Sequence, residues 1–157
     1  MTQCWRLDDA HQTMVLASDN SRCPRVIYWG PPLPQEEDLT ELCAVALPDV
    51  TGGMLDANPD LSLCPEAARS FPGQPGLILG DADGTPLLPK LRLTAVETSA
   101  QSLKFICEDA DIRLIYEATI ALDPETHVIV LQSRVTADRH LHLHWLAAPV
   151  LPAPQHS

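Results

Sequence analysis

The last third of the chain most constrains what it can fold into, because apolar and polar residues alternate there in successive runs. The runs cover residues 90–97, 102–108, 111–122, 126–136 and 140–148. A period of two places one row of side chains in a core and the other in water, which is typical of half-buried β-strands. Short segments of turn-forming residues separate the runs and have the lengths of hairpin turns. The sequence therefore predicts a large antiparallel meander.

The same alternation predicts which side chains face the core. We expect the inward rows to be Leu91, Leu93 and Ala95 on the first run, Leu103, Phe105 and Cys107 on the second, Ile112, Leu114, Tyr116, Ala118, Ile120 and Leu122 on the third, and Leu141, Leu143 and Trp145 on the last. Aromatic residues make up only 4% of the chain, so this core consists mainly of aliphatic side chains.

The first half of the chain predicts smaller elements. Strands are expected at residues 4–7, 12–18 and 25–29, which are bounded by turn residues or prolines. Apolar residues at helical spacing predict one short helix within 34–47, with Glu36, Glu37 and Asp38 in its first turn, where the helix dipole favours negative charge. Residues 49–76 are rich in proline and glycine and predict a long ordered loop.

Together these elements predict an all-β fold, an antiparallel β-sandwich with one short helix. At 157 residues the chain is long enough for one domain with a real core. We expect the sandwich to cover residues 1–149 and a proline-rich tail to cover 150–157.

Charge excludes several classes of partner. The chain has 10 basic and 21 acidic residues and a formal net charge of −11, which disfavours nucleic acids and anionic membranes as partners. No apolar run approaches the roughly 20 residues needed to span a bilayer, and the N-terminus shows no secretory signal. Five cysteines, an odd number without a CxxC pair, favour a reducing compartment, so we expect a cytoplasmic protein.

Three histidines, His140, His142 and His144, alternate along the last run and suggest zinc ligands. The first and third lie about 13 Å apart on a strand, however, which is too far for one ion. We therefore interpret them as a polar outer row and expect no metal site. Residues 80–84 resemble a calcium loop faintly, but they lack the remaining ligands and fit a hairpin turn better.

Catalytic motifs are missing from the sequence. The acidic residues occupy mostly turns or the expected first helical turn, so they do not form the opposed pair of a glycosidase. No nucleophile elbow, P-loop or dinucleotide fingerprint is present, and the cysteines are interpreted as core residues. The remaining candidate is the loop 63–76, which places Arg69 and Phe71 among prolines and glycines. Arginine and aromatic side chains bind sugars well. On this loop alone, however, an ordinary surface arginine beside a phenylalanine packed on the sandwich is the better explanation, because exposed arginines are common.

The order of these parts resembles the N-terminal β-domain of family 36 α-galactosidases. The resemblance covers essentially the whole chain and rests on an opening strand with Trp5, the segment 25–30 (RVIYWG), the acidic helix, the loop with Arg69 and Phe71, and the meander segments 114–116 and 128–135. The family loop often reads GRGDFR, whereas this chain reads ARSF at 68–71, without the aspartate and the second arginine.

The resemblance implies a galactose-mutarotase-like supersandwich, the non-catalytic first part of a retaining α-galactosidase that needs no cofactor. It implies that the domain packs on a catalytic (β/α)₈ barrel of the same enzyme, assists homo-oligomer formation and helps to build the sugar site. Arg69 and Phe71 are the expected substrate-binding residues. The alternative is a free-standing carbohydrate-binding or assembly module, and a barrel encoded downstream of Ser157 would distinguish the two.

Overall fold

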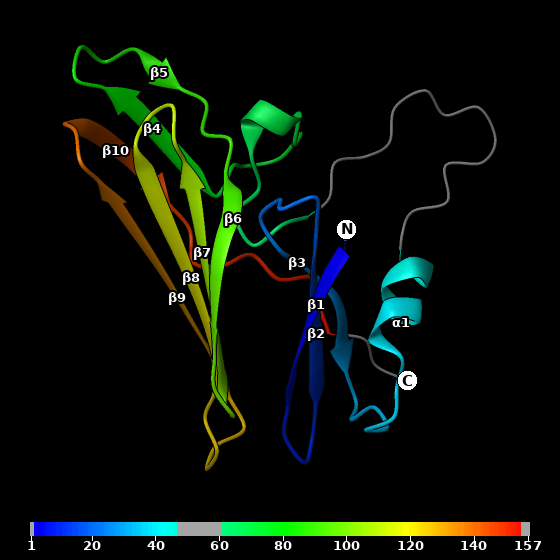
Figure 1. The fold of residues 1–157 in the computed structure, drawn as a ribbon. Coiled ribbons are helices and arrows are strands. Elements are labelled where there is room, and N and C mark those ends of the chain that lie inside the picture. The colour runs from blue at the N-terminus through cyan, green and yellow to red at the C-terminus, as the bar shows by residue number, and fades with distance from the viewer. Residues whose placement is uncertain (1, 47–60, 155–157) are drawn as a thin grey trace.

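The computed structural model describes residues 2–46 and 61–154. Its strands are β1 (Thr2–Asp8), β2 (Thr13–Asp19), β3 (Arg25–Gly30), β4 (Leu77–Asp81), β5 (Pro86–Leu87), β6 (Arg92–Thr98), β7 (Ser102–Asp109), β8 (Leu114–Leu122), β9 (Ile129–Ala137) and β10 (Leu141–Leu146). The helices are α1 (Leu39–Val45) and the 3₁₀ helix η1 (Ala67–Arg69). The predicted all-β antiparallel sandwich is confirmed (Figure 1).

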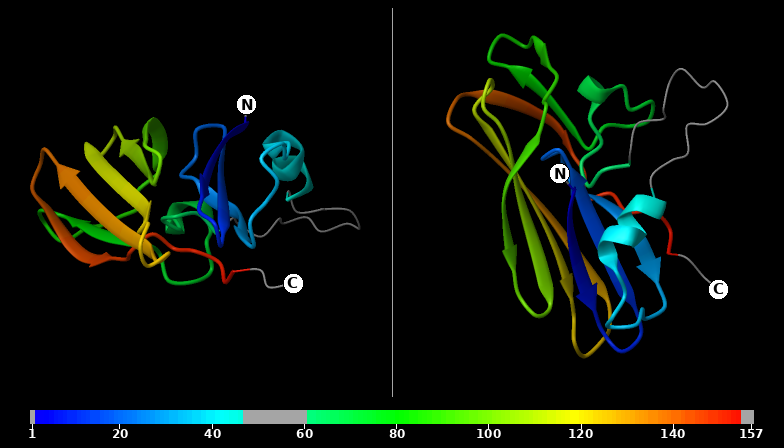
Figure 2. Two further views of the ribbon diagram at one scale, coloured as in Figure 1. Left: turned by 90° about the horizontal axis from the view of Figure 1, so that it is seen from below. Right: turned by 45° about the vertical axis from the view of Figure 1, so that its right-hand side comes forward.

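Three antiparallel sheets make up the described residues. The N-terminal sheet has the order β1-β2-β3, the meander sheet β6-β7-β8-β9, and the crossover sheet β10-β4-β5. The N-terminal sheet lies between the meander sheet and α1 (Figures 1 and 2). This position explains why β2 is buried along nearly its whole length instead of alternating.

The core lies between the N-terminal and meander sheets. The predicted inward row of β8, from Leu114 to Leu122, is buried at every second residue, and Leu103, Phe105 and Cys107 of β7 are at most 2% exposed. The rings of Trp5 from β1 and Phe105 meet in a T-shaped contact, with 5.1 Å between centroids and 77° between planes. The alternation in the sequence therefore identified the core-facing rows of these two strands correctly.

The meander has four strands rather than five. The last run, β10, leaves β9 and pairs with β4, with Leu141 opposite Asp81 and Leu146 opposite Leu77. A bulge interrupts the register between Leu143 and Trp145, and on this outer strand of its sheet the two side chains are 53% and 47% exposed. The prediction that both face the core is wrong.

A second bulge changes which residues of the first predicted run face the core. The register of β6 against β7 shifts between Leu93 and Ala95, so that Ala95 is exposed and Val96 packs against the core in its place. On the outer face of the meander, ion pairs join neighbouring strands: Lys104 contacts Glu97 at 3.3 Å and Glu117 at 2.9 Å, and Glu117 contacts Arg134 at 3.6 Å. Charges of alternating sign thus cross all four strands on the face away from the core.

The helix α1 is shorter than predicted, because the capping residue is Asp38. Its carboxylate accepts hydrogen bonds from the backbone N–H groups of Thr40 and Glu41, so Glu36 and Glu37 precede the helix. Cys43 of α1 forms a disulfide with Cys4 of β1. The cysteine count, which favoured a reducing compartment, did not predict this bond, and the cytoplasmic location stays a prediction. No helix in the described residues has the length and apolarity to cross a bilayer.

The expected boundary at residue 149 also stays a prediction. The backbone N–H of Val150 donates to the carbonyl of Leu63 at 2.9 Å, and Leu151 packs against the core. The first residues of the proline-rich tail therefore contact the sandwich.

Candidate functional site

The candidate site is the loop that joins the first three strands to β4. The part of the expected irregular stretch at residues 49–60 lies outside the described residues, whereas 61–76 is defined. Glu66 is extended and precedes η1, and Ser70 ends η1 in the left-handed region with φ 63°. The backbone N–H of Phe71 donates a hydrogen bond to the carbonyl oxygen of Glu66 at 3.4 Å. The two predicted site residues thus lie on a tight turn.

Arg69 is bound to the body of the sandwich through one side of its guanidinium group. Its Nε donates to Oε2 of Glu66 at 2.8 Å, and its Nη2 donates to the carbonyl oxygen of Leu91 at 3.3 Å. The side chain is 32% exposed, whereas that of Glu66 is only 4% exposed. These contacts brace the loop against the segment that leads into β6, and they leave part of the arginine accessible. Whether Arg69 also binds substrate stays a prediction.

Glu66 is a buried carboxylate with defined partners. Besides the contact with Arg69, its Oε1 accepts a 2.6 Å hydrogen bond from the backbone N–H of Leu91. Loss of solvent raises the pKa of this carboxyl above its ordinary value of 4.5, although the Leu91 N–H and the charge of Arg69 oppose that change. Sequence reasoning missed Glu66, since an acid three residues before an arginine in an irregular loop gives no sign that it will be buried.

We predict that Glu66→Gln removes a specific pH dependence of stability. Because the folded chain holds the Glu66 proton more tightly than the unfolded chain, the contribution of this group is greatest below pH 4.5 and is lost as the pH rises through the elevated pKa. Glutamine does not titrate. The unfolding free energy of the wild type, measured with denaturant between about pH 4 and 7, should therefore fall relative to that of the variant as the pH rises.

Glu125→Gln, the same exchange at an exposed turn residue, is the matched control for replacing a carboxyl group with an amide. The assignment of an elevated pKa would be contradicted in two cases. In the first, the difference in unfolding free energy between the wild type and Glu66→Gln is constant with pH. In the second, the wild type gains stability relative to the variant as the pH rises.

Phe71 lies half-buried beside the same turn. A Cβ atom placed on Gly73 would lie 2.7 Å from Cε1 of Phe71, so the ring packs directly on the backbone of Gly73. An alanine at position 73 would displace the ring. This packing fixes the ring without a charged partner, and its role in binding sugar stays a prediction, like that of Arg69.

A small apolar cavity of about 180 Å³ lies behind the loop. Its lining includes Cys64, Glu66, Ala67, Leu79, Leu88 and Leu91. Neither Arg69 nor Phe71 lines it, so the cavity does not join the two predicted residues into one pocket.

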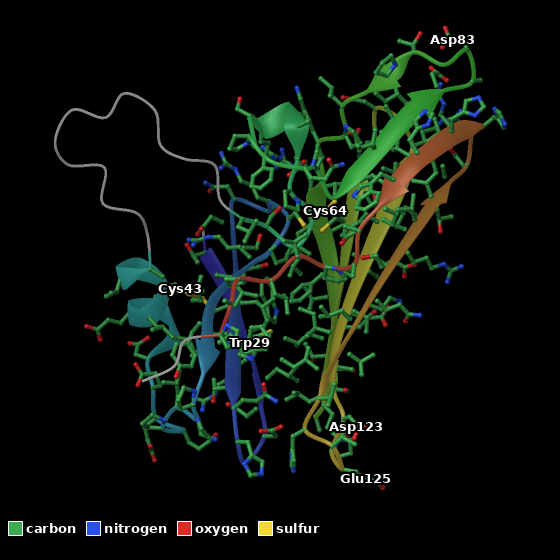
Figure 3. All side chains as sticks on the ribbon, turned by 180° about the vertical axis from the view of Figure 1, so that it is seen from behind. Trp29, Cys43, Cys64, Asp83, Asp123 and Glu125 are labelled. Atoms are coloured by element: carbon green, nitrogen blue, oxygen red, sulfur yellow. A yellow bond between two sulfur atoms is a disulfide. The ribbon has the colours of Figure 1, made fainter. Side chains whose placement is uncertain are left out.

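The three free cysteines are unsuited to nucleophilic chemistry. Cys23, Cys64 and Cys107 are all buried, and Cys64 lies inside the fold (Figure 3). Burial raises the pKa of the Cys64 thiol, and a hydrogen bond with Cys23, together with burial, raises that of Cys107. The thiols of Cys64 and Cys107 therefore stay protonated near neutral pH, and the burial of all three free cysteines agrees with their interpretation as core residues.

The turn acids are also structural. Asp83 lies at the tip of the β4–β5 hairpin, and Asp123 and Glu125 lie at the opposite end of the molecule (Figure 3). Asp83 accepts a hydrogen bond from the backbone N–H of Thr85, and Asp123 accepts two within its own turn, which lowers the pKa of each carboxyl. These acids form turns rather than a catalytic pair across a cleft.

His142 and His144 of β10 and His140, which directly precedes the strand, form an exposed row. The ring centroids of His140 and His142 are 5.1 Å apart, and those of His142 and His144 are 6.4 Å apart. Within residues 2–46 and 61–154, no group of three or more histidine, cysteine, aspartate or glutamate side chains is arranged to hold a metal ion. Nε2 of His144 instead lies close to Gly80 of β4, which has no side chain to obstruct it.

Comparisons with known proteins agree on one family. The model of the glycosyl hydrolase family 36 N-terminal domain matches residues 22–157. None of the curated protein sequences matches the chain.

Solved α-galactosidase structures share the fold. A variant of AgaA from Geobacillus stearothermophilus, in complex with 1-deoxygalactonojirimycin, has a TM-score of 0.73 at 16% identity over 93% of this chain. The enzyme from Lactobacillus brevis has a TM-score of 0.68 at 14% identity over 92%. The galactosidase domain of the α-galactosidase–sucrose kinase AgaSK has a TM-score of 0.69 at 16% identity over 93%. The chain spans 24%, 23% and 24% of these three proteins, respectively.

Proposed function

This chain belongs to the family of glycosyl hydrolase family 36 N-terminal domains, and from that premise we propose that it is the non-catalytic first part of a retaining α-galactosidase. The parent enzyme hydrolyses terminal α-linked galactose on a (β/α)₈ barrel, which is not among the elements that the structure describes in residues 2–46 and 61–154. The observation that carries the proposal is the family match over residues 22–157. The shared fold of enzymes that are named α-galactosidases adds support.

We propose three roles for the domain within that enzyme. It packs on the catalytic barrel, it assists the formation of a homo-oligomer, and its loop at Arg69 and Phe71 borders the galactoside site. The accessible part of Arg69 supports the last role, because Glu66 and Leu91 orient the guanidinium group while a third of the side chain stays exposed. A guanidinium group oriented in this way can donate to sugar hydroxyls at little entropic cost.

The first test of the proposal compares the chain with its parent. We predict that the purified 157-residue chain does not hydrolyse an aryl α-galactoside, whereas the enzyme translated from the complete reading frame does so with retention of configuration. The reason is that retaining hydrolysis needs two carboxyl groups about 5 Å apart on either side of the scissile bond. Product formation is followed by release of the aryl group, and the stereochemistry by NMR of the first product.

Two results would contradict this assignment. The first is turnover by the isolated chain that disappears when one of its own acids, such as Glu66, is replaced. The second is a complete reading frame whose product has no activity on α-galactosides although it is folded.

A further inference from the structure

A groove opens between the N-terminal sheet and the meander sheet, and neither Arg69 nor Phe71 lines it. Its two walls are β1 and β6, which are both outer strands of their sheets and lie next to each other without pairing (Figures 1 and 2). The groove has a volume of about 620 Å³. Its lining includes Gln3, Trp5, Ser21, Leu93, Thr94 and Val96.

Contacts at both ends of the sandwich join the N-terminal sheet to the meander sheet and fix the distance between the groove walls. At one end, the backbone N–H of Leu93 donates to the carbonyl of Ser21 at 2.8 Å, and Arg22 forms a β-bridge with Arg92. At the other end of the sandwich, Nε2 of Gln12 donates to the carbonyl of His127 at 2.7 Å. The spacing of the two walls is therefore set by the fold and needs no ligand to form.

The lining combines an apolar floor with neutral polar walls. Trp5, Leu93 and Val96 are partly buried against the core, and the edge-to-face contact with Phe105 fixes the Trp5 ring. Gln3, Ser21 and Thr94 add amide and hydroxyl groups above that floor. Among the described residues, no charged side chain lines the groove, although the chain as a whole carries a formal charge of −11.

This chemistry selects one class of ligand. An ion or a nucleic acid requires charged partners, which the lining does not supply. A pyranose ring has an apolar face of C–H groups, which stacks on an aromatic ring, and a rim of hydroxyl groups, which exchange hydrogen bonds with amide and hydroxyl side chains. The volume of the groove is within the range of small-molecule sites.

An added peptide strand is a less favourable occupant. A peptide that extends a sheet needs a regular edge of backbone donors and acceptors. The bulge between Leu93 and Ala95 interrupts the regular register of β6 along the groove, and such bulges protect sheet edges from pairing.

We propose that the groove between β1 and β6 is a non-catalytic binding site for a neutral oligosaccharide, with Trp5 as the stacking platform and Gln3 as a hydrogen-bonding wall. The inference that a sugar binds here rests on the shape and lining of the groove. The narrower expectation that this sugar carries an α-galactosyl unit rests on the proposed function.

The test is a titration of the 157-residue chain with the neutral trisaccharide raffinose, followed by calorimetry and by NMR of the indole N–H groups. We expect saturable binding with a dissociation constant on the order of 1 mM. Gln3→Ala, at an exposed position, should raise that constant about fivefold, the equivalent of one hydrogen bond. Trp5→Phe retains an aromatic ring against Phe105 and should weaken binding while the chain stays folded.

Trp145→Ala is the matched control, because Trp145 is an exposed tryptophan on β10 that does not line the groove. Its affinity for raffinose should equal that of the wild type. The proposal is overturned if the folded chain shows no saturable binding up to about 50 mM sugar, far above the expected constant, or if it binds extended peptides instead. Equal losses from Trp145→Ala and Gln3→Ala would also overturn it.

The complete enzyme separates this proposal from the proposed function. If that enzyme hydrolyses α-galactosides while the groove binds no sugar, the groove proposal fails and the proposed function stands. If the groove binds raffinose but the folded complete enzyme is inactive on α-galactosides, the proposed function fails and the groove proposal stands.

Discussion

Replacing Phe105 with alanine is expected to lower the free energy of unfolding by about 3–5 kcal/mol, the usual cost of emptying a fully buried aromatic site. Phe105 is 0% exposed and lies between the N-terminal and meander sheets, where its ring meets Trp5. The strand that carries Phe105, β7, is hydrogen-bonded to β6 on one side and to β8 on the other, so its backbone cannot move freely into the cavity. Since a domain of this size is stable by only about 5–15 kcal/mol, the change removes a large part of the margin.

The measurement is denaturant unfolding of the purified chain, with the slope checked for two-state behaviour. The matched control is Lys104→Ala, because Lys104 precedes Phe105 on β7 and faces solvent on the outside of the meander. That variant should unfold close to the wild-type midpoint in moderate salt, where surface ion pairs are screened. If the two variants lost similar stability, Phe105 would not be at the centre of the core.

The strands that the sequence predicted best are those with one buried face and two paired edges. In β7 and β8, alternate side chains are buried. Both are inner strands of the meander, and only one face of that sheet packs on the core, so their apolar side chains can be buried on that face alone. The strand predicted at residues 12–18 is present as β2, but it is buried along nearly its whole length because the N-terminal sheet lies between the meander sheet and α1 (Figure 1). A strand buried on both faces shows no alternation in exposure.

Alternation indicates which face of a strand is buried, but it does not indicate which strand it pairs with. The sequence of β10 alternates like that of its neighbours, and proximity along the chain favoured pairing with β9. The structure pairs β10 with β4, which lies 60 residues earlier, and Arg139 contacts Asp81 across that junction. The bulges at Leu93 and Leu143 are equally invisible in the pattern, because one extra residue in a strand alters the facing without changing the composition.

The sequence predicted where the candidate site lies in the chain, but not which contacts its residues make. Proline and glycine marked the loop, and the scarcity of basic residues drew attention to Arg69. Its contacts with Glu66 and Leu91 depend on how the loop folds against β6, which is a tertiary feature without a local signal. The β1–β6 groove was not predictable for the same reason, since its walls are 90 residues apart in the chain.

In the complete enzyme, Arg69→Ala is expected to lower kcat/KM for an α-galactoside about tenfold, which corresponds to about 1.4 kcal/mol of lost transition-state binding. The expected cause is the loss of a donor to sugar hydroxyls from the accessible part of the guanidinium group. Arg69→Lys should recover only part of the loss, because an ammonium group cannot contact Glu66 and a sugar with the same planar geometry. The measurement is initial-rate kinetics on an aryl α-galactoside.

Melting of the same preparations separates substrate binding from bracing. Removal of Arg69 deprives the buried carboxylate of Glu66 of the cation that is hydrogen-bonded to it, so the melting temperature of Arg69→Ala should fall. Arg134→Ala, at a surface arginine of β9 that pairs with Glu117, should change neither kcat/KM nor the loop. A lowered melting temperature with unchanged kcat/KM in the folded enzyme would show that Arg69 only braces the loop. A tenfold loss of kcat/KM that exceeds any loss of folded protein is the result expected if the loop borders the reacting sugar.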